Sequence, residues 1–188
     1  MRNSLLVLTM VAFLSSCTTV VNKVVKDPIM PDPTSSPIGS DINDIKMDTY
    51  IGVNLKKADP GLNKAHINVH VYNSVVLLTG EVPSKELKKL AGDTARAFTG
   101  QRQVHNELQV RGNSSIVART NDALISAKVA TKLTFDSEIK SSNIEVTAED
   151  SVVYLMGKVR RINAEKATAI ASQTSGVRSV VKVFEYVD

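Results

Sequence analysis

An internal repeat constrains the fold of this chain more than any other feature. The segment "VVLLTGEV" at residues 75–82 returns 77 positions later as "VVYLMGKV" at residues 152–159, with five of eight letters identical. Gly100 and Gly176 correspond at the nearly equal offset of 76. A shift of one residue is what small loop insertions produce. The chain therefore contains two copies of one structural unit, and we expect two similar modules.

Each copy begins with a predicted amphipathic helix. The apolar residues at helical spacing are Met47, Ile51 and Leu55 in copy one and Ile125, Val129 and Leu133 in copy two. Polar residues lie between them, as expected for a helix with one buried face. In copy two we expect the helix over residues 120–133, with Thr120 or Asn121 as its N-cap.

A hairpin follows in each copy. The alternating segments "HINVHV" (66–71) and "SNIEVT" (142–147) predict half-buried strands. Turn residues at 73–74 and 149–151 then make the two repeated segments the return strands. Gly80 and Gly157 lie inside these return strands, where a glycine indicates a bulge or a close backbone approach.

A second helix and a last strand complete each copy. The second helix is predicted to open at Pro83–Ser84 in copy one and at Asn163 in copy two. Gly100 and Gly176 are expected as left-handed caps at its C-terminal end. The last strands are "VHNELQV" (104–110) and "VVKVFEYV" (180–187).

The predicted fold class is α+β, with two tandem αββαβ modules at residues 41–112 and 117–188. Each is a three-stranded mixed sheet covered by two helices. A unit of this size buries only about 60% of its unfolded surface, so we expect the modules to pack together.

The N-terminal residues have a different character. Residues 1–16 contain Arg2 and the apolar run "LLVLTMVAFL", which is shorter than the ~20 residues of a membrane-spanning helix and predicts a signal peptide. The run ends in "LSSC", and Cys17 is the only cysteine of the chain. Four of the six prolines fall in residues 17–40, which predicts an extended tether.

The motifs of both copies resemble those of BON domains. Each return strand carries "G-x-V", and "SGV-x-x-V" at residues 175–180 precedes the last strand. Placed behind "LSSC", the two copies resemble the dual-BON-domain outer-membrane lipoproteins of Gram-negative bacteria. The resemblance implies cleavage before Cys17 and its acylation. It also implies an outer-membrane location, because Thr18 rather than Asp follows the cysteine, and a periplasm-facing, non-enzymatic protein that binds anionic phospholipid and supports envelope integrity.

Charge and side-chain chemistry argue against a nucleic-acid-binding protein, an enzyme or a metal-binding protein. The net charge of +4 becomes 22 − 19 = +3 without residues 1–16, which is too mild for a nucleic-acid surface. No nucleophile–base pair or phosphate loop is recognisable, and we expect no enzyme activity and no cofactor. Glu81, Glu86 and Asp93 are interpreted as solvated. His66 and His70 share a strand face ~13 Å apart, too far for one metal ion, and no metal site is expected.

The first helix of copy two is the candidate lipid contact. Leu124 lies ~100° from Ile125 around a helix, on a face shared with Lys128, Thr131 and, at its margin, Lys132. Phe135 is expected just past the helix end. An apolar tip beside lysines suits an anionic membrane such as one containing phosphatidylglycerol.

Two alternatives stay open. In the first, Leu124 packs on copy one instead of contacting lipid. In the second, the protein is an adaptor for envelope proteins, and its own lipid anchor only sets its location. Asp44 and Asp48 at the start of the first helix of copy one lead us to expect weaker lipid binding there. The family resemblance also assigns lipid binding to the first helix of copy two.

Overall fold

The computed structural model describes residues 40–187 and contains two αββαβ modules. The elements of the first module are α3 (Ser40–Ala58), α4 (Pro60–Lys64), β1 (His66–Tyr72), β2 (Val75–Val82), α5 (Lys85–Ala97), β3 (Gln103–Asn106) and β4 (Gln109–Val110). The elements of the second are α6 (Ile116–Phe135), the 3-10 turn η1 (Ser141–Asn143), β5 (Ile144–Glu149), β6 (Val152–Val159), α7 (Arg161–Ser172) and β7 (Ser179–Tyr186). The predicted α+β class and internal repeat are confirmed. The cysteine, signal and tether predictions lie outside the described residues.

Both sheets are mixed. The central strand β2 pairs antiparallel with β1 and parallel with β3 and β4, and β6 pairs antiparallel with β5 and parallel with β7. A two-residue turn joins the antiparallel strands, whereas α5 and α7 provide the crossover that a parallel strand requires.

The two hairpin turns have the same unusual backbone. Their central residues, Asn73, Ser74, Asp150 and Ser151, all have positive φ between 48° and 63°. This conformation matches the twist of the flanking strands. A buried aspartate from the first helix of each module, Asp44 or Asp122, accepts hydrogen bonds from both turn N–H groups. The repeat therefore extends to the contact that holds each hairpin on its helix.

The starts of α6 and α7 and the end of α6 differ from the predictions. Helix α6 begins at Ile116 and is capped by the Ser115 side chain, which accepts from the Ala118 N–H, so Thr120 and Asn121 are not the cap. Its first turn was missed because it contributes nothing to the buried apolar stripe. Helix α7 begins at Arg161, two residues before Asn163. Phe135 is the last residue of α6 rather than a residue past its end.

The strand glycines mark close backbone approaches without a bulge. Gly80 stands opposite Ile67 and Gly157 opposite Ile144 in uninterrupted ladders. A Cβ on either glycine would overlap a carbonyl oxygen of the preceding strand or turn, and Gly80 also has a φ of +111°.

The glycines that follow the second helices have positive φ, 98° at Gly100 and 95° at Gly176. They do not occupy the cap itself, because the cap residues are Phe98 and Gln173. Each helix ends earlier than predicted, so the left-handed residue lies in the turn that leads into the last strand.

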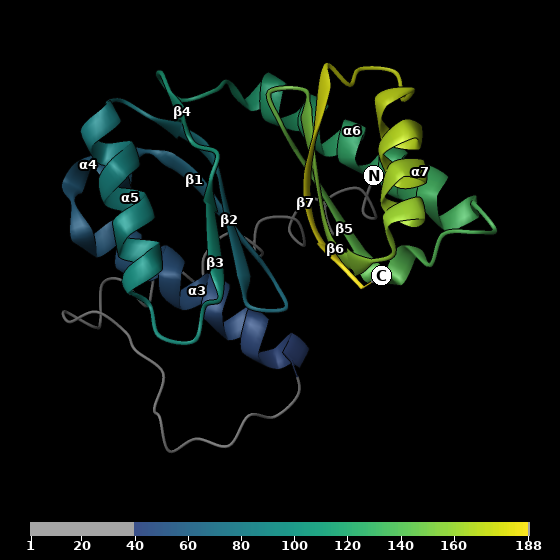
Figure 1. Cartoon of the computed structure of the whole chain (residues 1–188). Coiled ribbons are helices and arrows are strands. Elements are labelled where there is room, and N and C mark those ends of the chain that lie inside the picture. The colour runs from purple at the N-terminus through teal and green to yellow at the C-terminus, as the bar shows by residue number, and fades with distance from the viewer. Residues whose placement is uncertain (1–39, 188) are drawn as a thin grey trace, which may run out of the picture.

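The two modules pack sheet against sheet. Helices cover the outer face of each sheet, and the inner faces meet in the middle of the molecule (Figure 1). The buried residues shared by the two inner faces are Val75, Leu77, Tyr154, Met156 and Val183. The molecule is therefore a four-layer helix–sheet–sheet–helix arrangement, and the expected packing of the modules is confirmed.

Candidate functional site: the exposed face of α6

One face of α6 attaches the helix to the second module. Ile125, Val129 and Leu133 are 0–1% exposed and belong to the core beneath β5 and β6. Asp122 lies on the same side and holds the hairpin turn. These four residues recur at the spacing of one helical face, so the opposite face is turned outward.

The opposite face carries exposed apolar side chains. Val117 is 80% exposed, Leu124 55% and Phe135 84%. With Lys128 and Thr131 they recur at intervals of 7, 4, 3 and 4 residues, which places all five within ~60° of one another around a helix. We call this set the α6 stripe. It runs over ~27 Å, which is 18 residues at 1.5 Å each.

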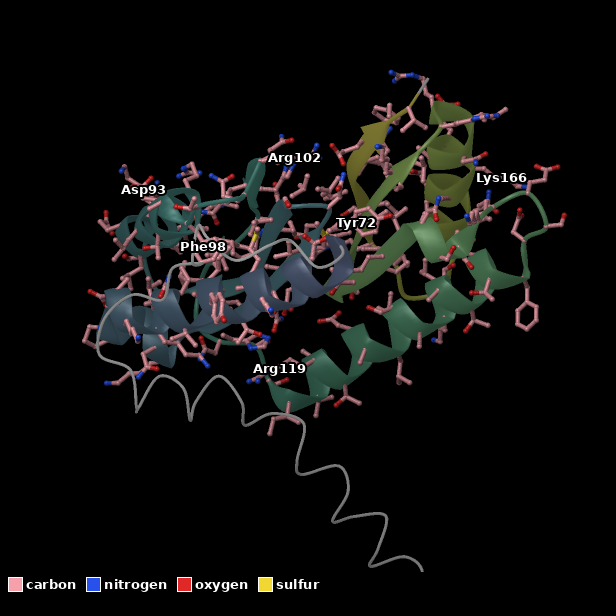
Figure 2. The ribbon with its side chains drawn as sticks, turned by 90° about the horizontal axis from the view of Figure 1, so that it is seen from below. Tyr72, Asp93, Phe98, Arg102, Arg119 and Lys166 are labelled. Atoms are coloured by element: carbon pink, nitrogen blue, oxygen red, sulfur yellow. The ribbon has the colours of Figure 1, made fainter. Side chains whose placement is uncertain are left out.

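The charges around the α6 stripe are positive. Arg119, Lys128 and Lys132 are the basic residues of α6, and Asp122, its single acidic residue, is buried on the other side. Arg119 lies near the N-terminal end of the helix as it crosses the lower surface (Figure 2). The exposed surface of α6 therefore combines apolar side chains with cations.

The structure places the predicted lipid-contact residues as follows. Leu124, Lys128, Thr131, Lys132 and Phe135 are all exposed on α6. Leu124 is 55% exposed and lies outside the apolar cluster between the modules.

Sequence reasoning missed Ile116 and Val117, which are 78% and 80% exposed in the first turn. The signal that identifies them is Ser115, a good N-cap residue that directly precedes them.

Among its described side chains, the equivalent helix of copy one, α3, shows no such face. Half of the eight exposed large apolar side chains of the described residues belong to α6, and none belongs to α3. Asp44 does not account for this difference, however. Asp44 is buried against its hairpin turn, and Asp122 has the same role in copy two, so this aspartate does not distinguish the modules.

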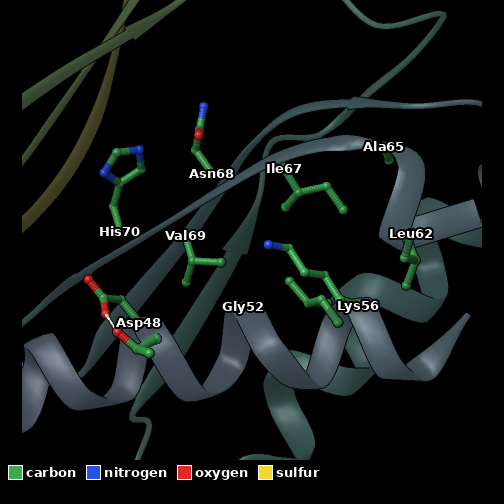
Figure 3. A pocket seen from close by; sticks show the side chains of 11 residues that line it. Asp48, Gly52, Lys56, Leu62, Ala65, Ile67, Asn68, Val69 and His70 are labelled. Carbon is green, nitrogen blue, oxygen red and sulfur yellow. Dashed lines mark hydrogen bonds between the residues drawn. The ribbon is translucent and has the colours of Figure 1, made fainter. Parts of the chain in front are cut away.

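A separate hollow lies between α3, α4 and β1. Its volume is about 320 Å³, and apolar side chains such as Leu62, Ile67 and Val69 line it together with Asp48 and Lys56 (Figure 3). Burial raises the pKa of Asp48 and lowers the pKa of Lys56. A hollow of this size suits only a small molecule, and it lies in the other module from the α6 stripe.

The interface between the modules holds a polar cluster at one end. Glu81 is fully buried, so its interpretation as a solvated residue was wrong. It would be solvated in an isolated module, but here the second sheet covers its strand face. Glu81 accepts hydrogen bonds from Arg111 Nη2 at 3.0 Å and from the Ser114 N–H at 3.1 Å. Arg111 also reaches Asp150 of the second module at 3.1 Å.

Two further groups complete this cluster. Glu149 of β5 accepts from Asn68 Nδ2 at 2.9 Å, and its other oxygen lies 3.7 Å from His66 Nε2. Burial raises the pKa of Glu149 to about 7, and the nearby Glu81 adds to this. Burial lowers the pKa of His66.

The fold and its repeated motifs define a protein of two tandem αββαβ modules, with exposed apolar and basic side chains on α6. Within residues 40–187, no helix has the length and apolar character needed to traverse a bilayer. The family comparison agrees: the BON domain matches residues 51–112 and 121–188. The chain belongs to the BON domain family.

Several known proteins are similar to most of the chain. It is 31% identical to the outer membrane lipoprotein DolP of Haemophilus influenzae, with 94% of this chain and 91% of the relative covered. It is 30% identical to a 21 kDa hemolysin of Actinobacillus pleuropneumoniae, with 83% and 79% covered. Osmotically-inducible protein Y of Escherichia coli is 26% identical, with 79% and 75% covered.

Proposed function

We propose that this chain is a non-enzymatic outer-membrane lipoprotein, anchored through Cys17 and facing the periplasm, whose second module binds anionic phospholipid through the α6 stripe and supports envelope integrity. The observation that carries the proposal is the α6 stripe itself. It combines Leu124 and Phe135, two exposed apolar side chains, with Lys128 between them. Similarity to an outer membrane lipoprotein supports the location.

The chemistry of the α6 stripe suits the boundary between head groups and acyl chains. Apolar side chains along one helix face insert into the acyl boundary when the helix lies in the membrane plane. Lysines beside them attract anionic head groups with about 1 kcal/mol per residue near the surface. The contact is screened by salt over roughly 8–10 Å, so binding should weaken as ionic strength rises.

The anchor and the α6 stripe act together. Stable attachment to a membrane takes more than one signal, and acyl chains on Cys17 provide the first. The sequence of residues 17–40 predicts a tether, and we propose that it leaves the modules free to face the membrane that holds them. The α6 stripe then adds a second, lipid-dependent contact.

Vesicle co-sedimentation tests the proposal. The protein is the unlipidated chain 18–188, which keeps every core and interface residue of the described part. Vesicles with and without phosphatidylglycerol are compared for wild type, Leu124→Glu and Lys128→Glu. Reversing one lysine charge should weaken binding roughly tenfold or more at low salt, since it removes about 1 kcal/mol of attraction and adds repulsion of similar size.

Lys46→Glu is the matched control. Lys46 is exposed on α3 at the position that corresponds to Leu124, so this substitution makes the same charge change as Lys128→Glu on the other module. Its binding should stay close to that of wild type. Equal vesicle binding by all four proteins, with unchanged melting temperatures, would refute the α6 contact and favour the adaptor function instead.

A further inference from the structure

The polar cluster between the modules brings together three groups that bind metals. The ring nitrogen of His66 and one carboxylate oxygen each of Glu81 and Glu149 all lie within 4.8 Å of one another. No other group of three such ligands occurs within residues 40–187. His66 and Glu81 face each other across β1 and β2, whereas Glu149 comes from β5 of the second module.

Burial makes the charge of this cluster costly. Glu81 is 0% exposed and Glu149 is 4% exposed, yet their carboxylates point at the same small space. Arg111 is the cation that pairs with Glu81, and it also forms an ion pair with Asp150. Buried carboxylates need a paired cation, a proton or a metal ion. Arg111 is divided between Glu81 and Asp150, and Glu149 accepts from the neutral Asn68 amide, which leaves room for a further positive charge.

The separation between His66 and Glu149 fits one shared ion better than a direct bond, and His66 Nε2 instead lies 3.3 Å from Asn68 Nδ2. His66 Nε2 and Glu149 Oε1 are 3.7 Å apart, which is too far for a hydrogen bond. Two ligands each ~2.1 Å from a tetrahedral Zn²⁺ lie ~3.4 Å apart. The observed separation is therefore close to that of two ligands on one ion.

Hydrogen bonds already orient the two carboxylates. Arg111 and the Ser114 N–H each donate to Glu81, and Asn68 donates to Glu149. A carboxylate has about four lone-pair sites, so each retains sites for a metal. Metal-binding carboxylates are typically held by such outer hydrogen bonds.

A buried hydroxyl without a partner lies beside the cluster. Thr79 is 0% exposed, and its Oγ1 has no hydrogen-bond partner among the described residues. Thr79 stands two residues before Glu81, on the same face of β2, and pairs with Asn68 on β1. It therefore projects from the same face of β2 as Glu81 and provides an unused buried oxygen on that face.

We propose that a divalent metal ion of the Zn²⁺ class binds His66 Nε2 and the carboxylates of Glu81 and Glu149, and that it joins the two modules. An imidazole with carboxylates suits Zn²⁺ better than Mg²⁺ or Ca²⁺, which prefer oxygen ligands alone. The metal links the modules because its ligands come from both. This site is independent of lipid binding.

Metal titration of chain 18–188, stripped with EDTA and then freed of chelator, tests the site. Zn²⁺ is added in competition with a chromogenic chelator, and the melting temperature is recorded with and without Zn²⁺. Wild type should bind one Zn²⁺ per chain and melt at higher temperature with the metal. His66→Asn and Glu149→Gln should each weaken binding by at least about tenfold and abolish the thermal shift.

A second His–Glu pair across the same two strands is the matched control. His70 Nδ1 lies 3.3 Å from Glu145 Oε1, but within residues 40–187 no third ligand lies close enough to form a group of three with them. His70→Asn and Glu145→Gln should therefore leave Zn²⁺ affinity unchanged. Glu149→Gln removes a buried charge while keeping the side-chain shape, so circular dichroism should show it folded. Absence of stoichiometric binding at micromolar Zn²⁺, or equal binding by all variants, would overturn the site.

Discussion

Gly157→Val should destabilise the second module by removing the space that its backbone needs. Gly157 is opposite Ile144 in the β5–β6 ladder. A Cβ there would lie 3.2 Å from the Asn143 carbonyl carbon and 3.3 Å from the Ile144 Cα, and it would overlap the Asn143 oxygen. These are backbone atoms, which cannot rotate away as a side chain does. The junction of η1 and β5 must move by roughly 1 Å to restore ordinary contact.

The expected loss of unfolding free energy is the sum of two contributions. Forcing extra atoms into a packed region costs typically 1–3 kcal/mol. Displacing β5 weakens at least one ladder hydrogen bond, worth about 1 kcal/mol. The sum is about 2–4 kcal/mol. A domain of 150–250 residues loses about 2–4 °C per kcal/mol, so the melting temperature should fall by roughly 4–16 °C.

Thermal unfolding of chain 18–188 followed by circular dichroism measures this change. Gly52→Ala in α3 is the control, because the nearest atom to its new Cβ would be Val69 Cγ2 at an ordinary 4.0 Å. This control should gain about 0.5–1 kcal/mol, since alanine favours a helix interior over glycine. A melting curve for Gly157→Val that coincides with wild type would refute the close-approach argument.

Three other predictions concern the interface and the anchor. Met156→Ala, which empties a fully buried position between the sheets, should cost about 2–5 kcal/mol in urea unfolding; a loss below 1 kcal/mol would mean that the sheets do not pack there. Burial raises the pKa of Glu185, but hydrogen bonds from Asn73 and the Arg102 guanidinium outweigh it and hold that pKa below its ordinary value of 4.5. The ionised form therefore adds stability above pH 4.5 that is lost as the pH falls through the lowered native pKa. Glu185→Gln should be less stable than wild type by about 1 kcal/mol at pH 7, with the difference vanishing near pH 3, and a pH-independent difference would contradict this. Cys17→Ser should abolish incorporation of a palmitate analogue in cells, and persistent label would exclude acylation at this residue.

Local patterns in the sequence were enough to predict the elements and their order. Helical spacing identified the cores of α3 and α6, and turn residues between the strand segments identified both hairpins, although Glu149 of the predicted turn belongs to β5. The structure confirmed the predicted opening of α5 at Pro83–Ser84, where the Ser84 side chain caps the helix by accepting from the Leu87 N–H. These features depend on neighbours a few residues apart, which a sequence displays directly.

Helix ends were less predictable than helix cores. The first turn of α6 carries Ile116 and Val117 outward, so it left no periodic signal of burial. The extent of the α6 stripe therefore became visible only when the start of the helix was known. The buried face of α6, in contrast, was correctly predicted from Ile125, Val129 and Leu133.

The contact between the modules was decided by the tertiary structure alone. A hairpin turn at residues 73–74 already pairs His66 with Glu81, because these positions are equally distant from the turn. Nothing in the spacing of the chain places Glu149 beside them, since it belongs to another sheet. The sheets meet because both inner faces bury apolar side chains, and that driving force is not directional. The shapes of the two complete surfaces therefore select which polar groups meet at the end of the interface.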